Sequence, residues 1–291
     1  EYWVENNFRE IHSPKLMASP SESNAELFKL EYFDGHAYLA QSPQFYKQMA
    51  MMAGFGSIFE IGPVFRADPS FTSRHATEFV SVDIEVSWID SHEDIMAIQE
   101  QLLVRALSAV KEKHGDDIKR LFDVDVVVPT VPFPRIPLAE AIDIVAARGH
   151  EIARGGDMDP EGERQIAAHV FEKYGHEFVF LTDYPSTVRP FYHMRHADND
   201  ALTNSYDLIW RGTEITTGAQ REHRVEKLIE QIKSKGLEPE GLQTYVDFFR
   251  YGAPTHGGFG MGLLRVLMLL LHQPNIREVG YLFRGPNRLE P

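Results

Sequence analysis

Two arms of alternating side chains constrain this sequence more than any other feature. In residues 79–86, Val or Ile alternates strictly with Phe, Ser, Asp and Glu. Successive side chains of a strand point to opposite faces, so this arm predicts a strand with one core face and one polar face. The preceding arm repeats the pattern, with Phe59, Ile61 and Phe65 on the apolar face and Arg66 on the polar one. We therefore expect the two arms to form an antiparallel hairpin.

The loop between these arms, residues 67–76, carries two basic side chains, Arg74 and His75. Together with Arg66 and an exposed Phe79, they could supply cations for phosphates and a ring that stacks on a base. An ordinary amphipathic hairpin with a solvated polar face explains the alternation equally well. The pattern alone leaves both interpretations open.

A second hairpin is predicted over residues 205–224, with its turn at residues 211–212. In the register that this turn sets, Glu214 lies opposite Ile209, and Asp207 is its diagonal neighbour on the same face. Two such carboxylates could hold a hard divalent cation such as Mg²⁺, which takes one or two carboxylates together with substrate phosphates. Two separately solvated carboxylates are the alternative.

Arg221 follows on the same strand but has the opposite parity to Glu214. On a straight strand it would point away from that carboxylate. We expect Gly218 to be the place where the strand bends and re-aims Arg221, because glycine inside a strand is typical of a bend.

Helical periodicity appears in several stretches. The expected helices span residues 91–114, 138–148, 160–174 and 222–235. The looser, proline-rich stretch 115–185 is interpreted as a small insertion between two halves of one sheet.

A shorter helix is expected after Ser42, where proline occupies the next position. On it, Gln44 and Lys47 are three residues apart and share a face. Such a pair at a helix start could bind a carboxylate, although these two residues alone favour an ordinary surface pair.

Composition limits the class of protein. The 291 residues carry 29 Lys and Arg against 43 Asp and Glu, a net charge of -14, so nucleic acid would have to meet a local basic patch. The chain has no Cys, which excludes disulfides, thiolate catalysis and Cys-ligated zinc. The longest apolar run, residues 266–271, is too short to cross a bilayer. We expect a cytoplasmic protein without a membrane partner.

Six motifs, taken in order, resemble the catalytic core of the class II aminoacyl-tRNA synthetases, most closely the aspartyl type of archaea and eukaryotes. They are "FREIHSPKL" from residue 8, "QSPQFYKQ" from residue 41, "FRADPSFTSRHATEF" from residue 65, "RPFY" from residue 189, "EITTGAQREH" from residue 214 and "GGFGMGLLR" from residue 257. The last is not a dinucleotide fingerprint, because no βαβ unit surrounds it. Its glycines are expected to let a strand-to-helix junction pass close to ATP.

The resemblance implies an α+β fold, with an antiparallel sheet of about six strands flanked by helices, over residues 1–291. It also implies a homodimer formed through the first motif around Pro14. The anticodon-binding OB domain of the family is expected to be absent from this chain. The implied activity is ATP-dependent activation of L-aspartate to aspartyl adenylate, followed by transfer to the 3′ end of tRNA.

Site residues are carried over from the family onto matching positions. Arg66 would hold the α-phosphate, Phe79 would stack on adenine, and Arg265 would cover the other ring face and meet the γ-phosphate; Arg66 and Arg265 are the implied catalytic residues. The remaining implied ATP contacts are Asp68, Arg74, His75, Glu214 and Gly262. The implied Mg²⁺ ligand is Glu214, with Asp207 and Thr217 as helpers.

The aspartate site is implied in the same way. Lys47 and Arg221 would grip the side-chain carboxylate, and Asp83 and Glu22 would take the α-ammonium, Glu22 from a mobile loop. The supporting residues are Ser42, Gln44 and Thr217. Two cations facing one carboxylate favour aspartate over asparagine, because an amide would leave them unpaired.

Several positions depart from the family pattern: Ser23, Asn24, Asp68, Thr217, Leu264 and Gly285. They leave room for a divergent relative. One alternative is an aspartate-adenylating enzyme that does not charge tRNA, resembling an asparagine synthetase with ammonia as acceptor. The other is a non-catalytic dimeric module that binds RNA or protein.

Overall fold

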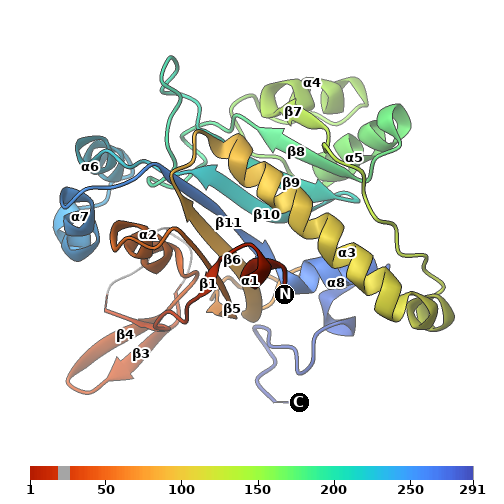
Figure 1. Ribbon diagram of the computed structural model, residues 1–291, viewed down its shortest axis with the longest axis horizontal. Coiled ribbons are helices and arrows are strands. Elements are labelled where there is room, and N and C mark those ends of the chain that lie inside the picture. The colour runs from red at the N-terminus through yellow and green to blue at the C-terminus, as the bar shows by residue number, and fades with distance from the viewer. Residues whose placement is uncertain (19–26, 291) are drawn as a thin grey trace.

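The structure is a computed structural model that describes residues 1–18 and 27–290. An eight-stranded sheet forms its centre (Figure 1). In spatial order its strands are β1 (Arg9–Glu10), β5 (Ser57–Phe65), β6 (Glu78–Ser87), β11 (His256–Gly262), β10 (Thr213–Gln220), β9 (Ser205–Trp210), β8 (Phe178–Thr182) and β7 (Arg135–Pro137). The six inner strands pair antiparallel, whereas β1 and β7 pair parallel with β5 and β8 at the two edges.

The predicted α+β class is therefore confirmed, but the sheet has eight strands rather than about six. The difference lies in the two short edge strands, of two and three residues, which carry little sequence signal. Both β7 and β8 come from the stretch interpreted as an insertion, so that stretch extends the sheet. A separate three-stranded sheet has the order β2 (Leu16–Met17), β4 (Gly35–Leu39), β3 (Lys29–Tyr32).

Helices cover both faces of the large sheet. The α-helices are α1 (Tyr2–Glu5), α2 (Gln44–Met52), α3 (His92–Phe122), α4 (Leu138–Ala147), α5 (Pro160–Tyr174), α6 (Val225–Ser234), α7 (Gln243–Arg250) and α8 (Leu263–Leu270), and the 3₁₀ turns are η1 (Pro239–Leu242) and η2 (Ile276–Glu278). The long α3 runs across one face of the sheet (Figure 1) and packs against the main hydrophobic core. No helix in the described ranges is long and apolar enough to cross a membrane.

The predicted helices are confirmed, although their ends differ from the prediction by up to eight residues. Ser91 caps the start of α3 in a capping box with Asp94. The helix runs past residue 114 and ends at Phe122, because the next residue, Asp123, adopts the left-handed conformation. Residues 222–224 are not helical, so the charged helix begins at Val225 rather than at residue 222.

The first hairpin forms in the expected register, with Phe59 opposite Ile84. Its apolar face joins the core below α3, but Ile61 was wrongly placed there and is 43% exposed. The reason is its position near the sheet edge, where the two-residue β1 pairs only with positions 58 and 59 of β5. The opposite face is not solvated, because α2 packs over it and Asp83 and Glu85 are buried.

The second hairpin also has its predicted turn and register, with Ile209 opposite Glu214. The predicted bend at Gly218 is wrong, since Gly218 pairs regularly with Tyr206 on one side and Phe259 on the other. Instead, the register shifts between Glu214 and Thr216. This bulge adds one residue and reverses the parity of the strand, so Arg221 lies on the same face as Glu214.

Gly218 has a different reason to be glycine. A Cβ at this position would lie 2.3 Å from the ring of Tyr206, which is fully buried. We expect Gly218→Ala to lower the free energy of unfolding by about 1–3 kcal/mol, the usual cost of overpacking a core, as measured by urea denaturation. Gly241→Ala is the control, because no atom of the described residues lies within 4 Å of its Cβ position. Equal stability of the two variants would contradict the steric argument.

Candidate active site

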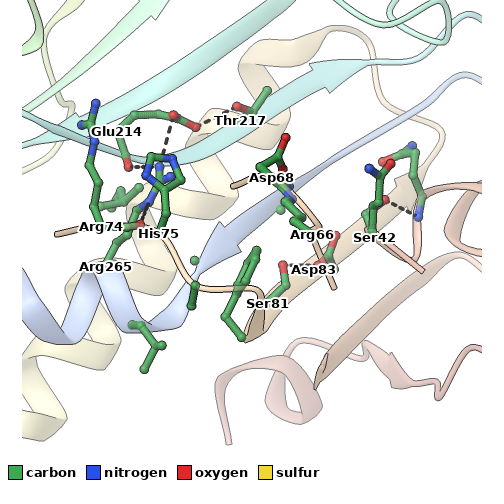
Figure 2. A pocket seen from close by; sticks show the side chains of 18 of the residues that line it. Ser42, Arg66, Asp68, Arg74, His75, Ser81, Asp83, Glu214, Thr217 and Arg265 are labelled. Atoms are coloured by element: carbon green, nitrogen blue, oxygen red, sulfur yellow. Dashed lines mark hydrogen bonds and ion pairs between the residues drawn. The ribbon is translucent and has the colours of Figure 1, made fainter. Parts of the chain in front are cut away.

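A pocket of about 610 Å³ opens on the face of the sheet opposite α3. Its walls come from α2, β6, the loop before β6, β10, the junction of β11 with α8, and residues 189–193. Figure 2 shows Arg74, His75 and Arg265 gathered beside Glu214, with Arg66 and Asp83 farther along and Ser42 beyond them. The pocket therefore joins motifs that lie far apart in the sequence.

One part of the pocket has an apolar lining. It consists of Ala76, Phe79, Gly262, Leu264 and Ile276. The guanidinium carbon of Arg66 lies 5.4 Å from the centroid of the Phe79 ring. A flat apolar ring with a cation at its face is a lining that suits a planar heterocycle.

The departure at Leu264 is explained by this lining. Leu264 packs against a small buried cluster formed by Met268, Ile276 and Phe283. Gly285 belongs to the same region, since a Cβ there would lie 2.7 Å from the Phe283 ring. The two unusual residues thus keep the C-terminal segment packed against the floor of the pocket.

Basic side chains line the neighbouring wall. Arg265 donates from Nη1 to the carbonyl oxygen of Glu214 at 2.8 Å and to its Oε2 at 3.2 Å. Arg74 donates from Nη1 to Oε2 of Glu163 at 2.5 Å. Arg66 is exposed, and no carboxylate in the described ranges forms an ion pair with it. Burial, reinforced by these arginines, lowers the pKa of His75, so it stays neutral beside them.

Glu214 faces the pocket with Thr217, whose hydroxyl donates to Oε1 at 3.1 Å. Burial alone would raise the pKa of Glu214, but the charges of Arg265 and Arg189 and the Thr217 hydrogen bond outweigh it and lower that pKa. Glu214 is consequently a carboxylate at neutral pH. It meets the main requirement for a ligand of a hard divalent cation.

Asp207 lies behind that wall, 6% exposed and paired with Arg189 at 2.7 Å. Burial raises the pKa of Asp207 to about 6. The negative charge of Glu214 adds to this rise, whereas the positive charge of Arg189 opposes it. Its Oδ1 has no hydrogen-bond partner among the described residues. Within residues 1–18 and 27–290, no three His, Asp or Glu side chains converge as metal ligands, so a cation here would take most of its ligands from a substrate.

The far end of the pocket is formed by a buried cluster of four charges. Lys47 donates to Oδ1 of Asp83 at 2.8 Å and lies 3.5 Å from Oε2 of Glu85, while Arg221 donates to Oε1 of Glu85 at 2.9 Å. Asp83 and Arg221 line the pocket, whereas Lys47 and Glu85 lie behind them. Burial would raise the pKa of Glu85, but Arg221 and Lys47 hold it below its usual value.

The surface interpretation of Lys47 is therefore wrong, since its side chain is only 1% exposed. Ser42 and Gln44 do reach the pocket, and Gln44 donates to Gln48 at 3.0 Å. Glu22, Ser23 and Asn24 lie outside the described residues.

A neutral hydrogen-bond network supports the charged cluster from behind. Gln48 contacts Nε2 of His256 at 3.1 Å and accepts from the hydroxyl of Tyr245 at 2.8 Å. Nδ1 of His256 lies 2.9 Å from the carbonyl oxygen of Pro254, so that nitrogen carries the proton. The network ties α2, α7 and β11 together around the site.

This network makes a pH prediction. Burial lowers the pKa of His256 from 6.5 to about 4. Because the pKa of His256 is lower in the folded state than in the unfolded state, its contribution to the free energy of unfolding is present above pH 6.5. That contribution is lost as the pH falls toward 4. From this group we expect the free energy of unfolding to be about 2 kcal/mol lower at pH 5 than at pH 7.

Urea denaturation at both pH values measures this loss. His256→Gln should unfold more easily at pH 7 but lose about 2 kcal/mol less on acidification than the unmodified chain. Replacing the exposed His12 with Gln is the control and should leave the loss intact. An unchanged pH dependence in His256→Gln would contradict the argument.

Several residues in and around the pocket were missed by the sequence reasoning, among them Glu85, Arg189, His193 and Glu163. Arg189 lines the pocket and its guanidinium carbon lies 3.6 Å from the Tyr184 ring. His193 also lines it, with a pKa held well below 6.5 by burial and by Arg221 and Arg189. Both lie in or beside the quoted motif "RPFY", which was a usable signal, whereas Glu163 sits in an ordinary-looking charged helix and gave none.

Comparison with known proteins identifies the family. The sequence model described as "tRNA synthetases class II (D, K and N)" matches residues 1–284. The chain belongs to this family. The resemblance inferred from the six motifs is thereby confirmed, and the fold class with it.

Individual relatives agree with this membership. The chain is 47% identical over 293 residues to the aspartate–tRNA(Asp/Asn) ligase of Aeropyrum pernix and 43% identical over 291 residues to the aspartate–tRNA(Asp) ligase of Pyrococcus abyssi. Both matches cover 100% of this chain, which spans 66% of the length of each relative. The asparaginyl-tRNA synthetase of Pyrococcus horikoshii, solved with asparaginyl-adenylate, superposes with a TM-score of 0.91 at 32% identity, covering 100% of this chain and 66% of that one.

Proposed function

We propose that this chain is the catalytic part of an aspartate–tRNA ligase. It would activate L-aspartate with ATP to aspartyl adenylate and pass the aspartyl group to the 3′ end of tRNA. The observation that carries the proposal is the joining, in one pocket, of an arginine-rich wall with a buried cluster of two cations and two carboxylates. The first part suits a triphosphate and the second an acidic amino acid.

The nucleotide would lie along the first part. Phe79 stacks on the base, Arg66 binds the α-phosphate, and Arg265 covers the other face of the base and reaches the γ-phosphate. The further contacts proposed for ATP are Asp68, Arg74, His75, Glu214 and Gly262. All of them except Gly262 offer charge or a hydrogen bond from side chains on the pocket wall.

The reaction needs no nucleophile from the protein. The α-carboxylate of aspartate attacks the α-phosphorus in line, the bond to pyrophosphate breaks, and pyrophosphate leaves with its electron pair. The chain contributes positioning of the two substrates and stabilisation of the developing negative charge through Arg66 and Arg265.

Aspartate would lie against the buried cluster. Arg221 reaches the pocket and binds the side-chain carboxylate, with Ser42, Gln44 and Thr217 in support. Asp83 takes the α-ammonium, together with Glu22. Lys47 is enclosed behind Asp83. It would favour an acidic side chain in the substrate through its positive charge and by holding Asp83 in position.

Mg²⁺ is the cation proposed for Glu214, with Thr217 and Asp207 close by. The carboxylate and hydroxyl oxygens fit its preference for oxygen ligands. Oδ1 of Asp207 has no hydrogen-bond partner among the described residues, which supports a second contact. When bound, the ion neutralises phosphate charge. We further propose that the protein acts in the cytoplasm as a homodimer formed through the region of Pro14.

Aspartate-dependent exchange of labelled pyrophosphate into ATP tests the first half of the reaction, with asparagine as the control substrate. We expect exchange with aspartate and little with asparagine. Charging of tRNA then tests the second half. Exchange without charging, but with asparagine formed from ammonia, would favour the alternative acceptor, and no exchange at all would overturn both enzymatic interpretations.

A further inference from the structure

Glu163, on α5, lies outside the six motifs and contacts two residues that line the nucleotide side of the pocket, Arg74 and Glu214. It is 5% exposed, although most charged residues of α5 face the solvent. The helix packs against β8, β9 and β10, and this packing directs Glu163 inward. A carboxylate is rarely buried in this way unless it has partners.

A single oxygen of Glu163 holds two parts of the ATP site together. Oε2 accepts from Nη1 of Arg74 at 2.5 Å and from the backbone nitrogen of Glu214 at 3.2 Å. The first contact fixes a guanidinium of the loop before β6, and the second fixes β10 at the start of its bulge. These two segments are 140 residues apart in the sequence, and Glu163 belongs to neither.

The guanidinium of Arg74 needs such an anchor. Residues 67–76 form no helix or strand, although the backbone nitrogen of Ile276 donates to the carbonyl oxygen of Ser73 at 2.9 Å. The other described hydrogen bonds of Arg74 use its backbone and are long, at 3.5 Å from its nitrogen to Thr72 and 3.4 Å from Arg265 to its carbonyl oxygen. A free arginine side chain would lose conformational entropy on binding a phosphate. A guanidinium offers five donors, so the bond to Glu163 leaves others for a ligand.

We propose that Glu163 is a positioning residue for ATP: it orders Arg74 and the start of strand β10 before the triphosphate binds. The inference rests on the function proposed above. Glu163 touches neither substrate and acts through Arg74 and Glu214. Its loss therefore weakens ATP binding and leaves aspartate binding unchanged.

Glu163→Gln is the decisive variant, because it keeps the size of the side chain and an acceptor for the Glu214 nitrogen but removes the charge that holds Arg74. We expect the KM for ATP in pyrophosphate exchange to rise about tenfold, with kcat and the KM for aspartate within about twofold. The matched control is Glu172→Gln, which should change neither constant. Glu172 is an exposed carboxylate on the same helix, and among the described residues it pairs only with Arg148.

A double-mutant cycle tests whether Glu163 acts through Arg74. Arg74→Ala should raise the KM for ATP more than Glu163→Gln does, and adding Glu163→Gln to it should have little further effect. Glu163→Asp, which retains the charge, should recover part of the loss. Thermal unfolding of each variant separates this effect from misfolding.

Calorimetry with a non-hydrolysable ATP analogue measures ATP binding without catalysis. It therefore tests the role of Glu163 independently of the proposed function. Weaker binding by Glu163→Gln than by Glu172→Gln supports the role even in an assay without catalysis. An unchanged KM and affinity for ATP, or an equal rise in the KM for aspartate, would overturn it. Absence of exchange by the unmodified chain would instead overturn the proposed function.

Discussion

Replacing Arg66 with alanine is expected to lower aspartate-dependent pyrophosphate exchange by about 10²–10³-fold, the usual loss when one preorganised donor to a developing charge is removed. Arg66 extends from the end of β5 over the Phe79 ring, 5.4 Å from its centroid, into the pocket. No carboxylate of the described ranges forms an ion pair with it, so its charge is available to a phosphate. The effect should fall mainly on kcat, because the charge on the α-phosphate grows in the transition state.

The same variant should fold normally, since Arg66 is exposed and anchors no described salt bridge. Equal thermal midpoints of the variant and the unmodified chain would establish this. Arg120→Ala is a suitable control, because Arg120 is an exposed arginine on α3 whose one ion pair within the described ranges is with Asp117. Retention of more than about a third of the activity by Arg66→Ala would remove Arg66 from the catalytic role.

Glu85→Gln should cause the largest loss of stability. Glu85 is 0% exposed and lies between two buried cations, 2.9 Å from Nε of Arg221 and 3.5 Å from Nζ of Lys47. The amide keeps the shape but removes the carboxylate that lies between the two cations. Breaking a buried pair in this way typically costs about 3–5 kcal/mol. Urea denaturation at pH 7 measures the change.

Glu78→Gln is the matched control on the same strand, where the side chain is exposed, and it should change stability by less than about 0.5 kcal/mol. Aspartate-dependent exchange should fall together with stability in Glu85→Gln, because Glu85 orients Arg221. A loss of less than about 1 kcal/mol would mean that Lys47 and Arg221 are satisfied without Glu85.

Local periodicity accounted for much of the fold. The alternation around β6 predicted both its partner and the face that carries Ser81 and Asp83, and the turn at residues 211–212 predicted the register of β9 and β10. These predictions were correct because the face of a strand on which a side chain lies and the type of a tight turn are set by neighbouring residues. The family resemblance then named most residues of the pocket wall.

Other features could not be read in this way. The bulge beside Ile215 depends on pairing with β9 and β11, and Gly218 is required by a ring on another strand. The sequence also did not show that α2 packs on β6. This packing encloses Lys47, which would otherwise lie at the surface.

By itself, the sequence determined the two central hairpins, the polar face of the first one and five of the α-helices, because these follow from periods of two and 3.6 residues along the chain. Only the tertiary structure decided which of those polar groups are buried, how Lys47, Asp83, Glu85 and Arg221 neutralise one another, and that Glu163 reaches Arg74. The physical reason is that burial and charge pairing depend on distances between segments far apart in sequence, and local patterns carry no information about those distances.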